Sequence, residues 1–228
     1  MKSALSFLIL STLLSANAIG QVISAPAYGL RSHETMEVVT VEIEKDQTII
    51  QLTVENRTTS GYFCVDRNTF IVLPDGSRLK LLKADGIPNC PQSHNFKRIG
   101  EVVKFSLYFP ALPSDSEWFD LVEECSENCF SVYGITLDSR LNKEIEKAYA
   151  LSESGKPAEA ATDFISIISS FEDNNHGILA SLYSSTIVMH LRNGDELSAK
   201  KWFDRMNNAD LPNKKLYIEN LHSRGIKW

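Results

Sequence analysis

The 228-residue chain carries no recognisable catalytic or nucleotide-binding motif. It has no glycine-rich phosphate loop, and Thr59-Ser60-Gly61 lacks the leading glycine of a nucleophile elbow. His33-Glu34 begins like a zinc-protease motif but has no second histidine. The formal net charge is −6 with acidic residues spread along the chain, which argues against nucleic-acid binding. We therefore expect a protein that is not an enzyme and that has no catalytic residue, cofactor or metal site.

Long hydrophobic runs are also scarce, and the one at the N-terminus is too short to span a bilayer. Lys2 precedes an apolar run from Ala4 to Leu14, and Ala16-Asn17-Ala18 then matches a signal-peptidase site. A second acceptable site ends at Gly20. Residues 1–20 are predicted to be a signal peptide, with an apolar N-terminal strand as the alternative. The mature chain is then exported to the periplasm or the extracellular space, without an integral membrane segment.

Residues 37–138 show the alternation of apolar and polar side chains that is typical of antiparallel strands. Val39, Val41 and Ile43 alternate with polar residues, and residues 50–55 repeat the pattern after a polar turn. Further strands are expected at 62–66, 70–73, 78–82, 103–109, 118–123 and 130–137, with a long loop at 83–100. About eight short strands with turn signals between them predict an immunoglobulin-like antiparallel β-sandwich.

Helical periodicity replaces the alternation over residues 139–228. Ser139 is expected to cap the first helix, Gly155 to end it, and Pro157 to begin the second. Two more helices follow, and residues 213–223 could form a fifth. The fourth helix is marked by these apolar residues: Leu197, Ala199, Trp202, Phe203 and Met206. The chain is thus predicted to combine an all-β domain with an all-α domain.

Part of one helical hairpin recurs 39 residues later: Gly155, Ala160 and Phe164 match Gly194, Ala199 and Phe203. A small residue lets two antiparallel helices approach closely, and the aromatic residue fills the groove between them. Residues 141–212 therefore resemble the tetratricopeptide repeat, whose usual period is about 34 residues. A plain helical bundle is the alternative. The resemblance implies a concave surface that binds a peptide or another protein.

The strand region also resembles a known group of proteins, through segments 81–88, 105–110 and 130–137. These segments are similar to those of uncharacterised exported proteins of Bacteroidota, in which a β-sandwich precedes a helical segment. The resemblance covers residues 37–138 and implies a bacterial envelope setting. It supplies no activity and no site residues.

All the cysteines lie in the strand region, at Cys64, Cys90, Cys125 and Cys129. An even number of cysteines in an exported protein favours disulfides. The Cys-x-x-x-Cys spacing of the last two, between strands and among glutamates, disfavours a reactive thiolate. Three pairings are possible, and we favour Cys125–Cys129 with Cys64–Cys90, because a hairpin brings the first pair together. A zinc ion held by the four thiolates is the alternative.

These features predict a non-catalytic binding or scaffold protein of the bacterial cell envelope, with a protein or peptide partner. The repeat helices would offer one surface and the sandwich loops a second, with these candidate contacts: Tyr62, Phe63, Asn95 and Phe96. The alternative is an enzyme with a site near the 83–100 loop, built from Asp66, Asp85 and His94.

Overall fold

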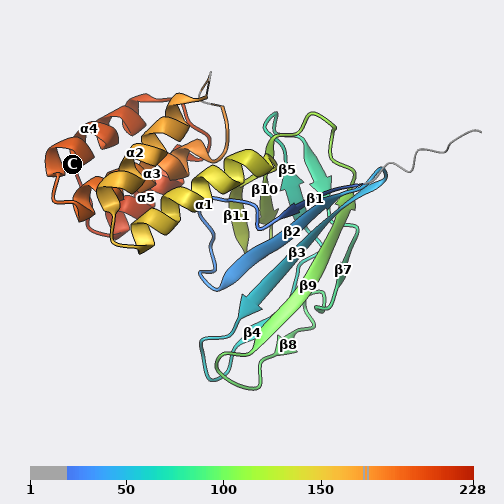
Figure 1. Cartoon of the computed structure of the whole chain (residues 1–228). Helices are drawn as coiled ribbons and strands as arrows, with labels where there is room; N and C mark the ends of the chain where they lie inside the picture. The colour runs from blue at the N-terminus through green and yellow to red at the C-terminus, as the bar shows by residue number, and fades with distance from the viewer. Residues whose placement is uncertain (1–19, 172, 174) are drawn as a thin grey trace, which may run out of the picture.

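The computed structural model describes residues 20–171, 173 and 175–228. Antiparallel sheets form the N-terminal part and five helices the C-terminal end of the chain (Figure 1). The predicted signal peptide lies outside the described residues, apart from Gly20. Within the described ranges, no helix is long and apolar enough to cross a membrane.

Two antiparallel sheets enclose one core. The larger has the order β1 (Gln21–Ser24), β2 (Met36–Ile43), β3 (Gln47–Glu55), β9 (Val102–Pro110) and β7 (Lys83–Asp85). The smaller has the order β11 (Ser131–Thr136), β10 (Trp118–Glu123), β5 (Thr69–Val72) and β6 (Arg78–Lys80). Alternate side chains of both sheets point inward, so Ile50 and Leu107 of the larger sheet share a hydrophobic cluster with Ile71 and Leu121 of the smaller.

The strands depart from the sequence prediction in two places. The β region begins with β1, ahead of the expected residue 37, and β1 pairs with β2 in the register Gln21↔Ile43. The expected loop at 83–100 contains two short strands, β7 and β8 (His94–Asn95). β8 pairs antiparallel with β4 (Tyr62–Phe63). These strands have two to four residues, which is too short for alternation to be detected. Backbone pairing with a neighbouring strand defines them.

The helices are α1 (Ser139–Glu153), α2 (Pro157–Ser169), α3 (Leu179–Arg192), α4 (Glu196–Asn208) and α5 (Lys214–Ser223). Consecutive helices from α1 to α4 pack against each other, and α5 packs against α3. Gly155 and Gly194 follow the first and third helices with φ of 76° and 77°, values that glycine adopts without strain. Pro157 begins α2 as expected, because the first turn needs no amide donor.

One expectation about these helices is wrong, and one of the residues that marked the fourth helix lies off its buried face. Asp138, rather than Ser139, caps α1, and its carboxylate accepts hydrogen bonds from the backbone N–H groups of Arg140 and Leu141. Leu197 is 78% exposed. The buried stripe of α4 consists of Ala199, Trp202, Phe203 and Met206. Its spacing is that of one helix face, and Leu197 falls on the opposite side.

The segment between β1 and β2 links the sheets to the helices. It runs along the free edge of β11, where the N–H of Thr136 donates to the carbonyl of Ala27 over 2.9 Å. On its other side the N–H of Ala27 donates to Oδ1 of Asn142 in α1, and the N–H of Leu30 donates to the hydroxyl of Tyr217 in α5. Figure 1 shows this blue segment passing between β11 and the helices. The segment therefore belongs to the interface between the two parts.

Candidate functional site

A buried carboxylate joins the smaller sheet to the helical part. Asp120 on β10 accepts hydrogen bonds from the N–H of Gly134 over 2.6 Å and from Nδ2 of Asn213 over 2.8 Å. Asn213 precedes α5 in the left-handed conformation, with φ of 56°. Burial raises the pKa of Asp120 above its usual value, although both hydrogen bonds act in the opposite direction. The contact fixes the start of α5 against the sheet.

Close packing of two glycines brings the start of α3 against the sheet. A Cβ on Gly177 would lie 2.3 Å from Cε3 of Trp118, and a Cβ on Gly134 would lie 2.6 Å from the carbonyl oxygen of Gly177. A real side chain at either position would force these groups apart. His176, next to Gly177, lies with its ring centroid 6.0 Å from that of Trp118.

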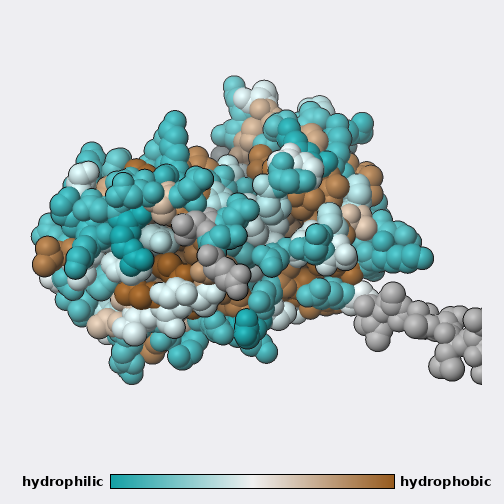
Figure 2. Space-filling view, turned by 90° about the horizontal axis from the view of Figure 1, so that it is seen from above, coloured by the Kyte–Doolittle hydropathy of each residue, from teal (hydrophilic) through white to brown (hydrophobic). Residues whose placement is uncertain are grey.

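A cleft of about 720 Å³ lies between the two parts, beside these contacts. The strand region contributes Gln21, the turn at 73–75 and residues 113 and 115–118. The rest of the lining lies around the start of α1 and between α2 and α3, at residues 137, 138, 141, 170, 171, 173, 175 and 176. Figure 2, seen from above, shows a largely hydrophilic surface in which hydrophobic side chains also reach the surface in the middle of the view. The volume is within the range of about 300–1,000 Å³ that is usual for ligand pockets, which often lie between domains.

The lining combines acidic and apolar groups. Exposed carboxylates come from both parts of the molecule: Asp75, Asp115, Glu117, Asp138 and Asp173. Buried or half-buried apolar side chains lie deeper, and they include Trp118, Leu137, Leu141 and Phe171. None of the described lining residues is lysine or arginine. The described lining therefore has carboxylate side chains, without a lysine or arginine, beside apolar groups.

His176 is the one histidine among the described lining residues, and it is 6% exposed. Its Nδ1 accepts a hydrogen bond from the N–H of Ile178 over 3.2 Å. Burial lowers its pKa to about 4, despite the opposing effect of Asp138 and Asp173. The ring is therefore neutral at pH 7 and carries its hydrogen on Nε2. No residue in the described part of the chain accepts a hydrogen bond from Nε2.

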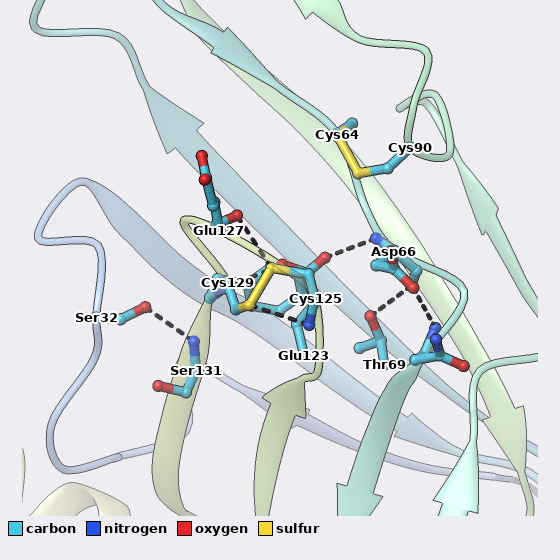
Figure 3. Close-up of a disulfide and its surroundings, with 12 residues drawn as sticks. Ser32, Cys64, Asp66, Thr69, Cys90, Glu123, Cys125, Glu127, Cys129 and Ser131 are labelled. Atoms are coloured by element: carbon cyan, nitrogen blue, oxygen red, sulfur yellow. Dashed lines mark hydrogen bonds between the residues drawn. A yellow bond between two sulfur atoms is a disulfide. The ribbon is translucent and has the colours of Figure 1, made fainter.

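The cysteines form two disulfides, Cys64–Cys90 and Cys125–Cys129, which are the pairs favoured from the sequence (Figure 3). The first joins the segment after β4 to the loop before β8, and the second closes the turn between β10 and β11. Both sulfur pairs are bonded, so no thiolate is left for a zinc ion. Two disulfides indicate an oxidising, extracytoplasmic environment.

Glu123 lies beside the second disulfide and organises the surrounding backbone. It is buried, and its carboxylate accepts a hydrogen bond from the N–H of Asp66 over 2.6 Å (Figure 3). It also accepts one from the N–H of Phe130 over 3.1 Å. Its oxygen lies within 4.8 Å of the sulfurs of Cys125 and Cys129. Burial raises the pKa of Glu123 above its usual value. The carboxylate has a structural role, because it pairs two otherwise unsatisfied backbone donors.

The residues proposed for an enzyme site lie on separate elements. Asp66 follows β4 and its carboxylate accepts from the N–H of Asn68, while Asp85 ends β7. His94 lies on β8, with its Nε2 2.9 Å from Oε1 of Glu101. Within the described ranges no hydrogen bond joins Asp66, Asp85 and His94 to one another.

The candidate contacts on the sandwich loops divide into two pairs. Tyr62 is 62% exposed and Asn95 is also exposed. Phe63 and Phe96 are buried in the core, where Phe63 packs against Phe105 and Phe130, so these two are not surface contacts. Neighbouring residues on a strand point to opposite faces, which separates exposed Tyr62 from buried Phe63.

The cleft was not anticipated from the sequence. Its lining comes from short turns and linkers that are far apart in the chain, and each has the composition of an ordinary polar loop. The run of acidic residues at Asp115, Glu117 and, later, Asp138 was the only available signal, and solvated loops commonly have such residues.

No family model, curated protein or solved structure matches the chain.

Proposed function

We propose that the protein is an exported, non-catalytic binding protein of the bacterial cell envelope, and that a protein or peptide partner binds in the cleft between its two parts. The observation that carries this proposal is the cleft of about 720 Å³, formed jointly by the strand region and the helices. Clefts between domains are frequent ligand sites because two surfaces can enclose one ligand.

We also infer an immunoglobulin-like sandwich followed by tetratricopeptide-like hairpins. The two sheets with a common core support the first assignment. The second is supported by burial at equivalent positions of two hairpins, where Ala160 and Ala199, and likewise Phe164 and Phe203, are at most 2% exposed. The signal-peptide pattern and the disulfides support export to the periplasm or beyond the cell.

Repeat helices commonly bind partners on their concave face, but here part of the helical surface is already used. Asn142 of α1 and Tyr217 of α5 hold the chain's own segment at Ala27 and Leu30. The cleft at the start of α1 and before α3 is open, which favours it over the surface of the repeat helices. The separate positions of Asp66, Asp85 and His94 favour binding over the enzyme alternative.

The experiment is to block the cleft and follow capture of a partner from envelope extract. Ser116 lines the cleft, and Ser116→Trp places an indole in it. Ser166→Trp is the matched control, because Ser166 is exposed on α2 and outside the lining. We expect the wild type and the control to capture the same protein, and Ser116→Trp to lose it while its circular dichroism spectrum is unchanged.

Equal capture by Ser116→Trp would exclude the cleft as the site. Turnover of a small substrate by the purified protein would instead support the enzyme alternative.

A further inference from the structure

The charge of the cleft restricts what can bind there. Its carboxylates come from the strand region and from the helical side, and no lysine or arginine side chain is among the described lining residues. Asp75, Asp115 and Glu117 line the cleft from the strand region, and Asp138 and Asp173 from the other side. A cleft lined by one sign of charge with low-dielectric walls concentrates its field and attracts the opposite charge. The ligand should therefore carry positive charge.

The apolar floor favours a cation with a hydrophobic stem over a bare ion. Trp118 and Leu141 are buried there, and Phe171 is half-buried with its ring centroid 5.1 Å from that of His176. Lysine and arginine side chains lay their methylene groups along such surfaces while the charged end stays near carboxylates. An arginine guanidinium can also stack on an aromatic ring.

His176 adds a hydrogen-bond donor that a simple amine cannot use. The side chain is more than nine-tenths buried, its Nδ1 is turned to the backbone of Ile178, and its Nε2–H has no acceptor among the described residues. His176 lines the cleft, so the edge of its ring that carries Nε2 is available to a ligand there. Among the described residues, the buried side-chain N and O atoms without a partner do not include Nε2 of His176, so this atom is open to solvent in the cleft. An acceptor that enters with the ligand replaces water there. A peptide supplies such an acceptor in every main-chain carbonyl.

We propose that the cleft binds an extended, basic peptide segment of a partner protein, with a lysine or arginine side chain among the carboxylates and a main-chain carbonyl accepting from Nε2 of His176. This inference rests on the proposed function, because it names the ligand class of the same cleft.

The test measures fluorescence anisotropy with three fluorescein-labelled heptapeptides, in which glycine alternates with arginine, serine or glutamate. We expect the arginine peptide to bind at least about tenfold more tightly than the other two, and to weaken as salt screens the charges. Spermidine, an amine without a carbonyl, is added as a competitor. At equal charge concentration it should displace the arginine peptide less effectively than the unlabelled peptide does.

A matched pair of variants locates the binding. Asp115→Asn with Glu117→Gln removes two charges from the cleft, and we expect about tenfold weaker binding of the arginine peptide. Glu146→Gln with Glu153→Gln removes two exposed charges from α1 outside the lining, and should leave the affinity unchanged.

Several outcomes would overturn the inference. Equal binding of the arginine and serine peptides, or an equal effect of the two variant pairs, would exclude recognition of a basic segment by these carboxylates. Displacement by spermidine as effective as by the peptide would exclude the role of the carbonyl. If no peptide binds while capture from extract still depends on Ser116, the ligand class is wrong but the proposed function stands. If capture does not depend on Ser116 either, both are wrong.

Discussion

Replacing Asp120 by alanine should loosen the junction between the sheets and the helices. Its carboxylate accepts from the N–H of Gly134 and from Nδ2 of Asn213, and alanine leaves both donors without this acceptor. Gly134 is buried, whereas Asn213 is only partly buried and can regain a hydrogen bond from water. The two losses are therefore unequal.

The magnitude follows from these two environments. A buried donor without an acceptor costs about 1–3 kcal/mol, and the partly exposed amide of Asn213 belongs near the lower end of that range. Removing a carboxylate whose pKa is raised by burial returns part of the desolvation free energy. We therefore expect Asp120→Ala to lower the free energy of unfolding by roughly 1–3 kcal/mol. Asp120→Asn should lower it by less than about 1 kcal/mol, because its oxygen still accepts from Gly134 and the amide of Asn213 can rotate.

The assay is urea unfolding at neutral pH, followed by tryptophan fluorescence and by the helical signal in circular dichroism. Asn213→Gly completes a double-mutant cycle, since glycine tolerates the φ of 56° without strain. We expect a coupling free energy of about 1 kcal/mol between Asp120 and Asn213. A loss below about 0.5 kcal/mol in Asp120→Ala would refute the reasoning, because that is the size of an ordinary surface substitution.

Two further predictions concern the disulfides and His176. Replacing Cys64 and Cys90 by alanine should lower the free energy of unfolding by about 3.5 kcal/mol, and replacing Cys125 and Cys129 should lower it by about 2 kcal/mol. The sequence separations are 26 and 4, and a longer closed loop restricts the unfolded chain more. Urea unfolding measures both losses, and the reverse order would contradict this prediction. The pKa of His176 is about 4 in the folded protein and about 6.5 when unfolded, so the unfolded chain takes up the proton first and stability is lost as pH falls through this interval. His176→Asn removes this titration. Between about pH 7 and pH 4, the free energy of unfolding of the wild type should fall by up to about 3 kcal/mol more than that of the variant. Parallel pH profiles of the two proteins would exclude the effect.

Local sequence patterns predicted the elements whose own residues define them. β10 has the expected bounds 118–123, because its apolar residues and the flanking turns mark both ends. The starts and ends of the helices follow Gly155, Pro157 and Gly194, whose backbone preferences act locally. The two disulfide pairs also followed from sequence, since one pair is separated by a single turn and leaves the other as its complement.

Other elements depend on a neighbour that local patterns do not reveal. β1 and β7 are too short to show alternation, and exist because β2 and β9 supply backbone partners. Asp138 and Ser139 are both acceptable caps, and the backbone path into α1 selects Asp138. For the candidate site, the sequence indicated acidic loops but not that Glu117, Asp173 and His176 line one cleft.

The sequence by itself determined the two-part composition, the periodicity of each part and the positions of most strands and helices, because these depend on the faces that each residue run must bury. Tertiary structure decided how the parts join. The segment at 25–35, Asp120 with Asn213, and the paired glycines Gly134 and Gly177 bring distant loops together. The cleft is a product of that long-range packing, so its acidic wall and the unpartnered edge of His176 exist only in the folded molecule.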